Sequence, residues 1–287
     1  MTNNTLRLAV PNKGRLKEPT LALLKKIDLE FNCSERQLCC PAQNFALELL
    51  FISASCIPQY VQTGLADLGI TGYDLVQEKA AQVTILKKLG YGKTNLTLAV
   101  GAESKIKRLS DLNGKRIATS FGRLTKEFLA QQKISAQVIE IEGAVEITPR
   151  LGLAEAIADL VSSGETLKLN GLKIMQTILE SETVLLSNQA LNPAKLALVK
   201  SLLLRFDSVL NAKEKKYLTL NAAEELLPKI KKVIPGLTAP TVLRLAQPGM
   251  LAVQSVIDSQ ASWPIIEQLK ALGAQDIVLW PIEKIIY

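Results

Sequence analysis

Residues 142–172 contain the side chains best suited to chemistry in this chain. Glu155 and Asp159 are four residues apart, which on a helix would place both carboxylates on one face. The small-residue turn 162–166 follows, and its glycine and hydroxyls allow backbone N–H groups to converge on an anion. Carboxylates beside such a turn suit a phosphorylated sugar, because the acids would hold ribose hydroxyls or a Mg²⁺ ion. The alternative is an amphipathic helix that ends at a glycine turn and binds no ligand.

A second anion site is predicted near the amino terminus. Residues 6–10 predict a short strand, and the apolar periodicity near residues 19–27 predicts a helix. Lys13, Gly14 and Arg15 lie in the loop between them. A strand, a basic loop and a helix amino terminus in this order suit a phosphate group. The alternative is a glycine turn with two solvated basic side chains.

A strand that ends in glycines and an acid is predicted over residues 66–74. Glycine at the carboxyl end of a strand lets a ligand approach the backbone closely. Asp74 would then accept a hydrogen bond from a nucleotide or a ribose. The alternative is that Asp74 caps the helix that follows.

The order of elements predicts the fold class. Strands and helices alternate from residue 6 to residue 186, which favours parallel or mixed α/β sheets. Residues 182–186 predict a strand that returns to the first sheet, so we expect two lobes with a cleft between them. A helix from Asn192 to about residue 216 leads into a βαββαβ order, which is typical of a ferredoxin-like domain.

The composition excludes several classes of protein. The 287 residues contain no histidine, which excludes every catalytic triad or pair that depends on one. No apolar run approaches the roughly 20 residues of a membrane helix, and no secretory signal is apparent, so we expect a cytoplasmic protein. The net charge of +7 with only 5% aromatic residues favours polyphosphate substrates over nucleic acid, although a solvated basic surface would give the same charge.

The four cysteines lie in one early region and lack the paired spacing of a zinc site. We therefore expect them to be free thiols. These residues are Cys33, Cys39, Cys40 and Cys56.

Ordered blocks of this sequence resemble the signature of ATP phosphoribosyltransferase. Within residues 142–172 the similar blocks are G-A-V-E at residues 143–146, P-R-L-G-L-A at 149–154, D-L-V-S-S-G-E-T-L at 159–167 and N-G-L at 170–172. The text I-P-Q-Y-V-Q-T-G-L-A-D-L-G-I-T-G-Y-D at residues 57–74 is similar to the family as well. Near the carboxyl terminus, P-G-L-T-A-P-T-V and L-W-P-I-E-K-I-I resemble the regulatory domain of the family's long form.

The resemblance, together with the strand pattern, implies an α/β fold. We expect a bilobal, type II periplasmic-binding-protein-like catalytic unit followed by a C-terminal ferredoxin-like βαββαβ domain. Lobe I would comprise residues 1–95 with a return segment 181–211, and lobe II residues 96–180 with the phosphoribosyl-diphosphate site. The regulatory domain would comprise residues 212–287.

The resemblance also implies a reaction. N1 of the adenine of ATP joins 5-phosphoribosyl 1-diphosphate, giving N1-(5-phosphoribosyl)-ATP and diphosphate in the first step of histidine biosynthesis. Such a site works mainly by orientation and electrostatics, because the ring nitrogen needs little activation. The family further implies Mg²⁺ as cofactor, feedback inhibition by histidine and a homo-oligomer, either dimer or hexamer. No nucleic-acid or membrane partner is expected.

The resemblance assigns residues to this site. Glu146 and Asp159 are the expected catalytic acids, and the metal ligands stay open. The residues expected to bind phosphoribosyl diphosphate are Glu155, Asp159, Ser162, Ser163, Gly164, Glu165, Thr166 and Leu167. The residues expected to contact the nucleotide or diphosphate are Lys13, Gly14, Arg15 and Asp74.

Two positions depart from the family's R-x-x-D-I-P text, since Ser53 replaces the arginine and Cys56 the aspartate. An arginine fork that would bind a nucleotide phosphate is therefore missing, which predicts weaker or altered ATP binding. Phe121 and Gly122 also stand where Tyr-Pro is frequent. Two alternatives to the enzyme follow: a catalytically weak regulatory paralogue, and a two-lobed small-ligand binding protein without chemistry.

Overall fold

The computed structural model describes residues 4–34 and 37–287. The first three residues of the predicted lobe I, and residues 35 and 36, therefore lie outside the described chain. The chain divides into two compact units. The second unit comprises Lys26–Asp28 and Val199–Tyr287, and the remainder of the chain up to Leu198 forms the first.

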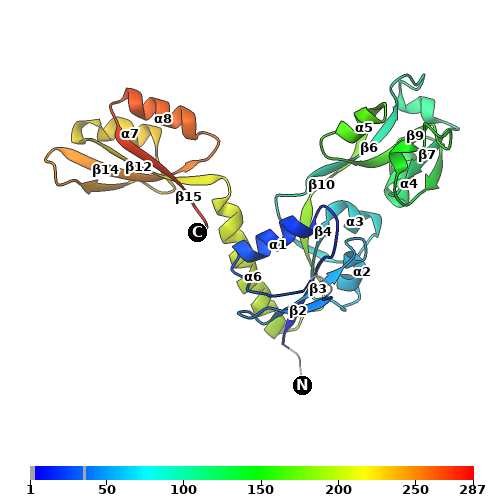
Figure 1. Ribbon diagram of the computed structural model, residues 1–287, viewed down its shortest axis with the longest axis horizontal. Coiled ribbons are helices and arrows are strands. Elements are labelled where there is room, and N and C mark those ends of the chain that lie inside the picture. The colour runs from blue at the N-terminus through cyan, green and yellow to red at the C-terminus, as the bar shows by residue number, and fades with distance from the viewer. Residues whose placement is uncertain (1–3, 35–36) are drawn as a thin grey trace. The chain divides into compact units, whose positions relative to one another are not determined.

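A six-stranded sheet forms one lobe of the first unit, in the order β2-β3-β1-β4-β11-β5 (Figure 1). Its strands are β1 (Leu6–Pro11), β2 (Cys39–Pro41), β3 (Leu47–Ile52), β4 (Leu68–Gly72), β5 (Thr84–Lys88) and β11 (Thr183–Ser187). The helices are α1 (Lys17–Lys26), α2 (Ile57–Gln62) and α3 (Tyr73–Glu78). β1 pairs in parallel with β3 and β4, while the returning strand β11 pairs antiparallel with β4 and β5.

A five-stranded sheet forms the other lobe, in the order β10-β6-β9-β7-β8. Its strands are β6 (Thr94–Gly101), β7 (Arg116–Thr119), β8 (Gln137–Glu140), β9 (Ala156–Val161) and β10 (Leu172–Ser181). The helices are α4 (Gly122–Gln131), α5 (Glu165–Leu169) and the 3-10 turns η1 (Leu109–Leu112) and η2 (Val145–Ile147). Leu98 and Ala158 pack with Leu124 of α4 on one face. Ile157 packs with Val145 and Leu167 of η2 and α5 on the other.

Two antiparallel strands join the lobes, because β6 leaves the first lobe and β10 returns to it, with Thr94 opposite Ser181. A further link comes from Glu78 of α3. Its carboxylate accepts hydrogen bonds from the N–H groups of Arg123, at 2.9 Å, and Leu124, at 3.0 Å, at the start of α4. These strand orders and the double crossing confirm the predicted bilobal, type II periplasmic-binding-protein-like fold.

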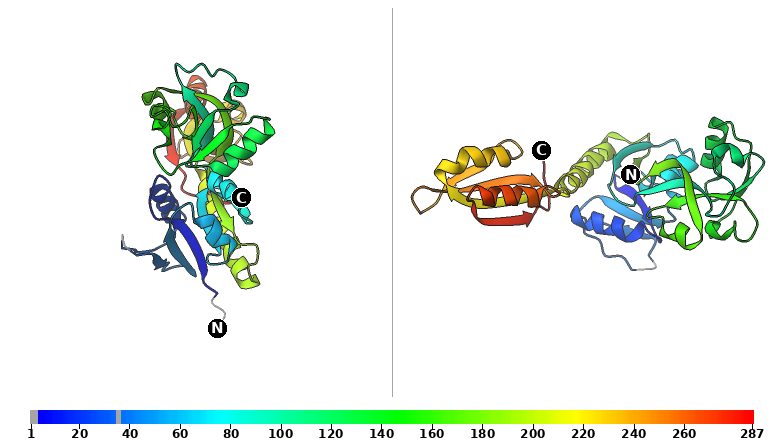
Figure 2. Two further views of the ribbon diagram at one scale, coloured as in Figure 1. Left: turned by 90° about the vertical axis from the view of Figure 1, so that its right-hand side faces the viewer. Right: turned by 90° about the horizontal axis from the view of Figure 1, so that it is seen from above.

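The second unit begins within α6 (Pro193–Ala212) and contains a four-stranded antiparallel sheet in the order β13-β14-β12-β15. Its elements are β12 (Lys215–Ala223), η3 (Glu224–Leu226), α7 (Leu227–Val233), β13 (Thr241–Arg244), β14 (Met250–Asp258), α8 (Ser262–Ala271) and β15 (Gln275–Pro281). Ile230 of α7 and Leu269 of α8 share one core with Leu218 and Val253 of the sheet. Both helices therefore cover the same face (Figures 1 and 2), which confirms the ferredoxin-like prediction. No described helix is long and apolar enough to cross a membrane.

Two local expectations are wrong. Glu155 and Asp159 do not share a helix, because residues Ala156–Val161 form β9 at the centre of a sheet. Cys33 and Cys40 are not free thiols but form a disulfide, while Cys39 and Cys56 are free. The pairing of β2 with β3 positions Cys40, and its Cα lies 5.8 Å from that of Cys33, a usual distance for a bridge.

A buried ion pair anchors the first turn of α6, and we expect its loss to destabilise the first unit. Lys195 Nζ lies 2.7 Å from Asp67 Oδ2, which also accepts from the Arg7 N–H at 2.9 Å. Asp67→Ala leaves the ammonium group without its partner, at a cost of about 3 kcal/mol in the free energy of unfolding. Urea unfolding measures this cost. The matched control is Glu140→Ala, which removes the exposed pair with Lys126 and should cost below about 1 kcal/mol; equal costs would contradict the prediction.

Candidate active site

Three loops lie along one edge of the five-stranded sheet. β7 runs parallel to β8 and to β9, so the carboxyl ends of these strands meet at the same edge. Ligands of open α/β sheets bind outside the carboxyl ends of parallel strands. The loops there are residues 120–121 after β7, 141–144 after β8 and 162–164 after β9. The sugar-site residues predicted at 146, 159 and 162–167 lie in or beside the last two.

The loop after β9 is a tight connection to α5. Gly164 has φ +78°, a left-handed backbone that favours glycine, and Ser162, Ser163 and Thr166 are exposed. The first helical bond runs from the Lys168 N–H to the Gly164 carbonyl. No backbone partner for the N–H groups of Thr166 and Leu167 exists within the described residues.

The Leu167 side chain anchors this loop from below, because it is 4% exposed and packs with Ile157 and Val161. Leu167 therefore offers only its backbone to a ligand. The exposed hydroxyls and unpaired N–H groups above it have the character of an anion site. The structure thus brings Ser162, Ser163, Gly164, Glu165, Thr166 and Leu167 together in one loop.

Asp159 and Glu146 form an acidic pair beside this loop. Asp159 lies in the second half of β9, where its Oδ1 accepts from the Leu160 N–H at 2.8 Å. Burial raises the pKa of Asp159 above its usual range, and the nearby negative charge of Glu146 raises it further. Neither carboxylate forms an ion pair within the part of the chain that the structure describes. Both are free to meet a sugar hydroxyl or a cation.

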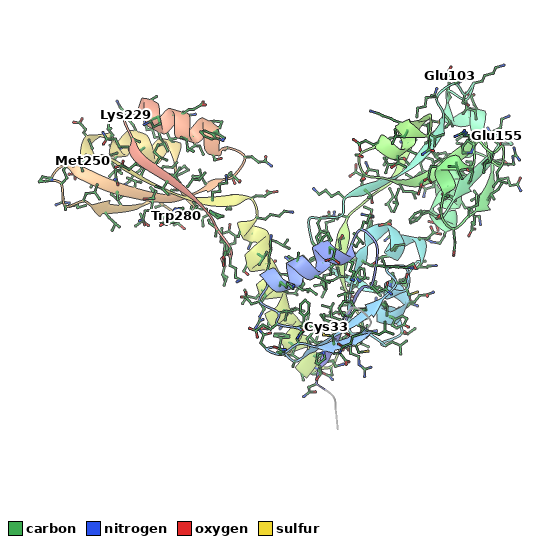
Figure 3. The ribbon with its side chains drawn as sticks, viewed as in Figure 1. Cys33, Glu103, Glu155, Lys229, Met250 and Trp280 are labelled. Carbon is green, nitrogen blue, oxygen red and sulfur yellow. A yellow bond between two sulfur atoms is a disulfide. The ribbon has the colours of Figure 1, made fainter. Side chains whose placement is uncertain are left out.

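Glu155 lies away from this pair. A strand rises about 3.3 Å per residue, so four residues along β9 span about 13 Å instead of about 6 Å on a helix. The Glu155 carboxylate accepts from Arg116 Nη2 at 2.5 Å and from the Arg116 N–H at 2.8 Å. These side-chain and backbone hydrogen bonds lower the pKa of Glu155 to about 2. Glu155 and Glu103, both labelled in Figure 3, line a hollow of about 810 Å³ at the edge of the lobe opposite the acidic pair.

The basic loop of the first lobe follows β1 and precedes α1. Gly14 has φ +80°, again left-handed, and Lys13 is exposed. Arg15 Nη1 donates to the Gly92 carbonyl at 2.9 Å, and Nη2 donates to Thr94 Oγ1 at 3.4 Å. Arg15 therefore ties the loop to the crossing strand β6, and Lys13 is the cation of this loop that points to solvent.

Asn12 is a candidate that the sequence analysis missed. Its N–H donates to the Ile52 carbonyl at 2.9 Å, but its buried Oδ1 has no hydrogen-bond partner within the described residues. An unpaired buried acceptor costs free energy unless a ligand donates to it. The signal in the sequence was an amide directly after an apolar strand, at the place where β1 ends.

Asp74 lies in the first turn of α3 and is 1% exposed. Ser181 Oγ, at the end of β10, donates to Asp74 Oδ1 at 2.5 Å. The side chain makes no capping bond, so the alternative role as a helix cap is wrong. A Cβ at Gly72 would lie 2.2 Å from Asp74 Oδ1, which explains the glycine there. Asp74 thus connects the start of α3 to the end of β10, and its contact with a nucleotide stays a prediction.

The loop after β3 contains the two departures from the family text. Ser53 Oγ lies 3.1 Å from Ser55 Oγ, and Cys56 precedes α2 without a capping bond from its side chain. Thr71 Oγ1 donates to the Ala54 carbonyl at 2.8 Å and holds the loop against β4. Small hydroxyls and a thiol therefore occupy this loop, and residues 53–56 contribute no cation to it.

The described residues contain no group of three or more Cys, Asp or Glu side chains that could hold a metal ion. Glu146 and Asp159 provide two carboxylates near each other. Mg²⁺ is commonly held by one or two carboxylates together with substrate phosphates. The donor set therefore fits a magnesium ion that is bound jointly with a diphosphate.

We expect Glu155→Gln to lower stability modestly and in a pH-dependent way. The side chains of Arg116 and Glu155 are 40% and 35% exposed, so the loss at pH 7 is about 0.5–1 kcal/mol in the free energy of unfolding. The folded pKa lies below the ordinary 4.5, so this stabilisation is present above about pH 4.5 and is lost as the pH falls towards 2. Urea unfolding at several pH values measures the difference. A difference that does not shrink in acid would contradict the prediction.

Comparisons with known proteins agree with this geometry. The sequence model of the family described as "ATP phosphoribosyltransferase" matches residues 53–208, and that described as "HisG, C-terminal domain" matches residues 212–284. The chain is 42% identical to the ATP phosphoribosyltransferase of Bacteroides thetaiotaomicron and 41% identical to that of Methanosarcina acetivorans. Both alignments cover 98% of this chain and 99% of the relative.

A solved structure is similar as well. A chain of the ATP phosphoribosyl transferase (HisG:HisZ) complex from Thermotoga maritima aligns with a TM-score of 0.64 and 28% identity. The alignment covers 72% of this chain and 99% of that one. The sequence matches extend over nearly the whole chain, and the two-lobed fold agrees with the solved relative. The chain therefore belongs to the long form of the ATP phosphoribosyltransferase family, the transferases of the first step of histidine biosynthesis.

Proposed function

We propose that the acidic pair Glu146–Asp159 and the loop after β9 form the phosphoribosyl-diphosphate half of the active site. The single observation that carries this proposal is the placement of two unpaired carboxylates beside a loop of exposed hydroxyls and free N–H groups. A phosphorylated sugar presents hydroxyls, which carboxylates bind, and a phosphate, which such a loop binds. Glu155 is left out of the site, because Arg116 already holds its carboxylate at the opposite end of β9.

The loop would bind the 5-phosphate of the sugar. Thr166 and Leu167 would donate their backbone N–H groups, and Ser162, Ser163 and Thr166 their hydroxyls. Hydrogen bonds to a charged group are about twice as strong as neutral ones, so a few such donors suffice. The buried Leu167 side chain keeps the loop in place while the phosphate binds.

The chemistry is a substitution at the anomeric carbon. N1 of adenine forms the new bond to that carbon, and the carbon–oxygen bond to diphosphate breaks with the electron pair leaving on diphosphate. Asp159 and Glu146 would orient the ribose hydroxyls and stabilise the positive charge that develops on the ring. Mg²⁺ bound with the substrate would neutralise charge on the departing diphosphate.

The first lobe would bind ATP. Lys13 supplies positive charge for the phosphates, Asn12 an unpaired acceptor for a donor of the nucleotide, and Gly14 a loop without a side chain. Arg15 would act mainly by holding this loop to β6. Ser53 and Cys56 lack the charges of the usual arginine and aspartate, which favours a higher KM for ATP than in relatives with both residues.

An activity assay with paired variants tests the proposal. The wild-type protein, ATP, 5-phosphoribosyl 1-diphosphate and Mg²⁺ should give phosphoribosyl-ATP and diphosphate, both measured by chromatography. Asp159→Asn should lower kcat/KM for the sugar by about 100-fold, since a charge that acts on the developing cation is lost. Thr166→Ala should weaken sugar-diphosphate binding by about 1–3 kcal/mol.

The control is Glu155→Gln, which is also a loss of one carboxylate from the same segment. This variant should keep kcat/KM within about twofold of the wild type, because Glu155 lies about 13 Å along the strand from Asp159. An equal loss in Glu155→Gln and Asp159→Asn would contradict the assignment of the sugar site.

We also propose that the second unit senses histidine and that the protein is a homo-oligomer in the cytoplasm. Residues 212–284 match the C-terminal domain model, and the unit has a core of its own around Leu218, Ile230 and Leu269. Trp263 and Trp280 are 72% and 53% exposed on this unit, which favours contacts with further copies of the chain.

Histidine should inhibit the full-length protein and protect the second unit from hydrogen exchange. The expected protection lies in β12 to β15, because a ligand that binds the folded unit slows its local opening. Mass spectrometry with and without histidine measures the exchange, and the activity assay measures inhibition. Inhibition accompanied by protection only in the loop after β9 would place histidine in the active site and would contradict the sensor role of the second unit.

A further inference from the structure

Thr97 lies in the middle of β6, and its buried side-chain hydroxyl makes no hydrogen bond to any described residue. It is 2% exposed, and its Oγ1 has no partner within the described residues. A buried hydroxyl without a partner destabilises the folded protein, and each such group needs an explanation. An apolar residue of the same shape would avoid this cost, so the hydroxyl points to a ligand or to a partner that moves.

The sheet register places Thr97 beside Asp159. The two residues are directly opposite each other in the antiparallel pairing of β6 with β9. Side chains opposite each other lie on the same face, with Cβ atoms about 4.5–5.5 Å apart. That face is the one covered by η2 and α5, because Ala99 and Ile157, two residues along each strand, pack there with Val145 and Leu167.

The Asp159 carboxylate still lacks a donor on this face. Its Oδ1 accepts from the Leu160 N–H at 2.8 Å, and Oδ2 has no partner within the described chain. On the other neighbouring strand, Thr119 lies on the opposite face, beside Thr125 of α4, and its hydroxyl donates to the Ala158 carbonyl at 2.7 Å. Thr97 is therefore the hydroxyl next to Asp159 that is free to donate.

We infer that Thr97 is a positioning residue of the sugar site, whose hydroxyl donates to the free oxygen of Asp159 when the ribose binds. The bond fixes the orientation of the carboxylate so that its remaining lone pairs meet the ribose hydroxyls. This inference rests on the role proposed for Asp159. In the free protein the hydroxyl stays unpaired. The folded protein is therefore less stable than it would be with an apolar residue at position 97.

Four variants of the full-length protein test this role: Thr97→Val, Thr97→Ser, Asp159→Asn and the double variant Thr97→Val/Asp159→Asn. Titration calorimetry with 5-phosphoribosyl 1-diphosphate and Mg²⁺ measures the affinity. Thr97→Val should weaken binding about 10-fold, and Thr97→Ser should restore it to within about threefold, because only serine keeps the donor. In the Asp159→Asn background, Thr97→Val should change the affinity less than twofold.

Thermal unfolding separates positioning from a structural role. Thr97→Val removes an unpaired buried hydroxyl, so its Tm should rise by about 2–4 °C while the affinity falls. The matched control is Ser255→Ala, which removes another buried, unpaired hydroxyl, in β14 of the second unit, and should leave the affinity unchanged.

The outcomes are distinct. Unchanged affinity in Asp159→Asn would overturn the proposed sugar site itself. Weakened affinity in Asp159→Asn together with normal affinity in Thr97→Val would overturn the inference about Thr97 alone. An equal loss on Thr97→Val in both backgrounds, or a fall in its Tm, would also overturn it, because either result describes packing and not positioning.

Discussion

The burial of β9 between β6 and β7 is the constraint on which the proposed sugar half of the site depends. Backbone hydrogen bonds hold the strand on both edges, and Ala156, Ile157 and Ala158 are fully buried. This packing allows β9 only one register with its neighbouring strands, because a shift of one residue would exchange its two faces. This position places Asp159 on the face of the sheet that η2 covers. It also places the loop after Val161 at the edge where the parallel strands end.

The carboxylates at the two ends of β9 differ in whether they have a cationic partner. At the amino end, Arg116 neutralises Glu155 through side-chain and backbone bonds, and that carboxyl is strongly acidic. At the carboxyl end, Asp159 lies near Glu146, neither forms an ion pair within the described residues, and burial makes the charged form of Asp159 less favourable. The first arrangement stabilises the folded lobe. The second arrangement destabilises the free protein, and a sugar or a cation bound at the proposed site would offset this cost, as is typical of functional sites.

The two lobes differ in the polar groups of their loops. The loop after β9 has three exposed hydroxyls and lies beside two carboxylates, whereas residues 53–56 after β3 have no charged side chain. The lobes nevertheless stay linked through side chains far apart in the sequence. Asp74 bonds to Ser181 at the end of β10, and Glu78 accepts the first N–H groups of α4. Both acids lie on α3, so this helix of the first lobe bonds to the second lobe at both of its ends.

The sequence by itself determined the alternation of strands and helices, the ferredoxin-like order and the family motif, because these depend on local periodicity and local text. It did not distinguish strand from helix at residues 155–161, since the run E-A-I-A-D-L-V lacks a decisive period and only the neighbours β6 and β7 make it a strand. Only the tertiary structure decided that Glu155 pairs with Arg116, that Cys33 is bridged to Cys40 and that Thr97 lies opposite Asp159. The physical reason is that the pairs Glu155–Arg116 and Thr97–Asp159 join residues far apart along the chain. The Cys33–Cys40 bridge spans only seven residues, but it depends on the position that the pairing of β2 with β3 gives to Cys40. Local spacing encodes neither.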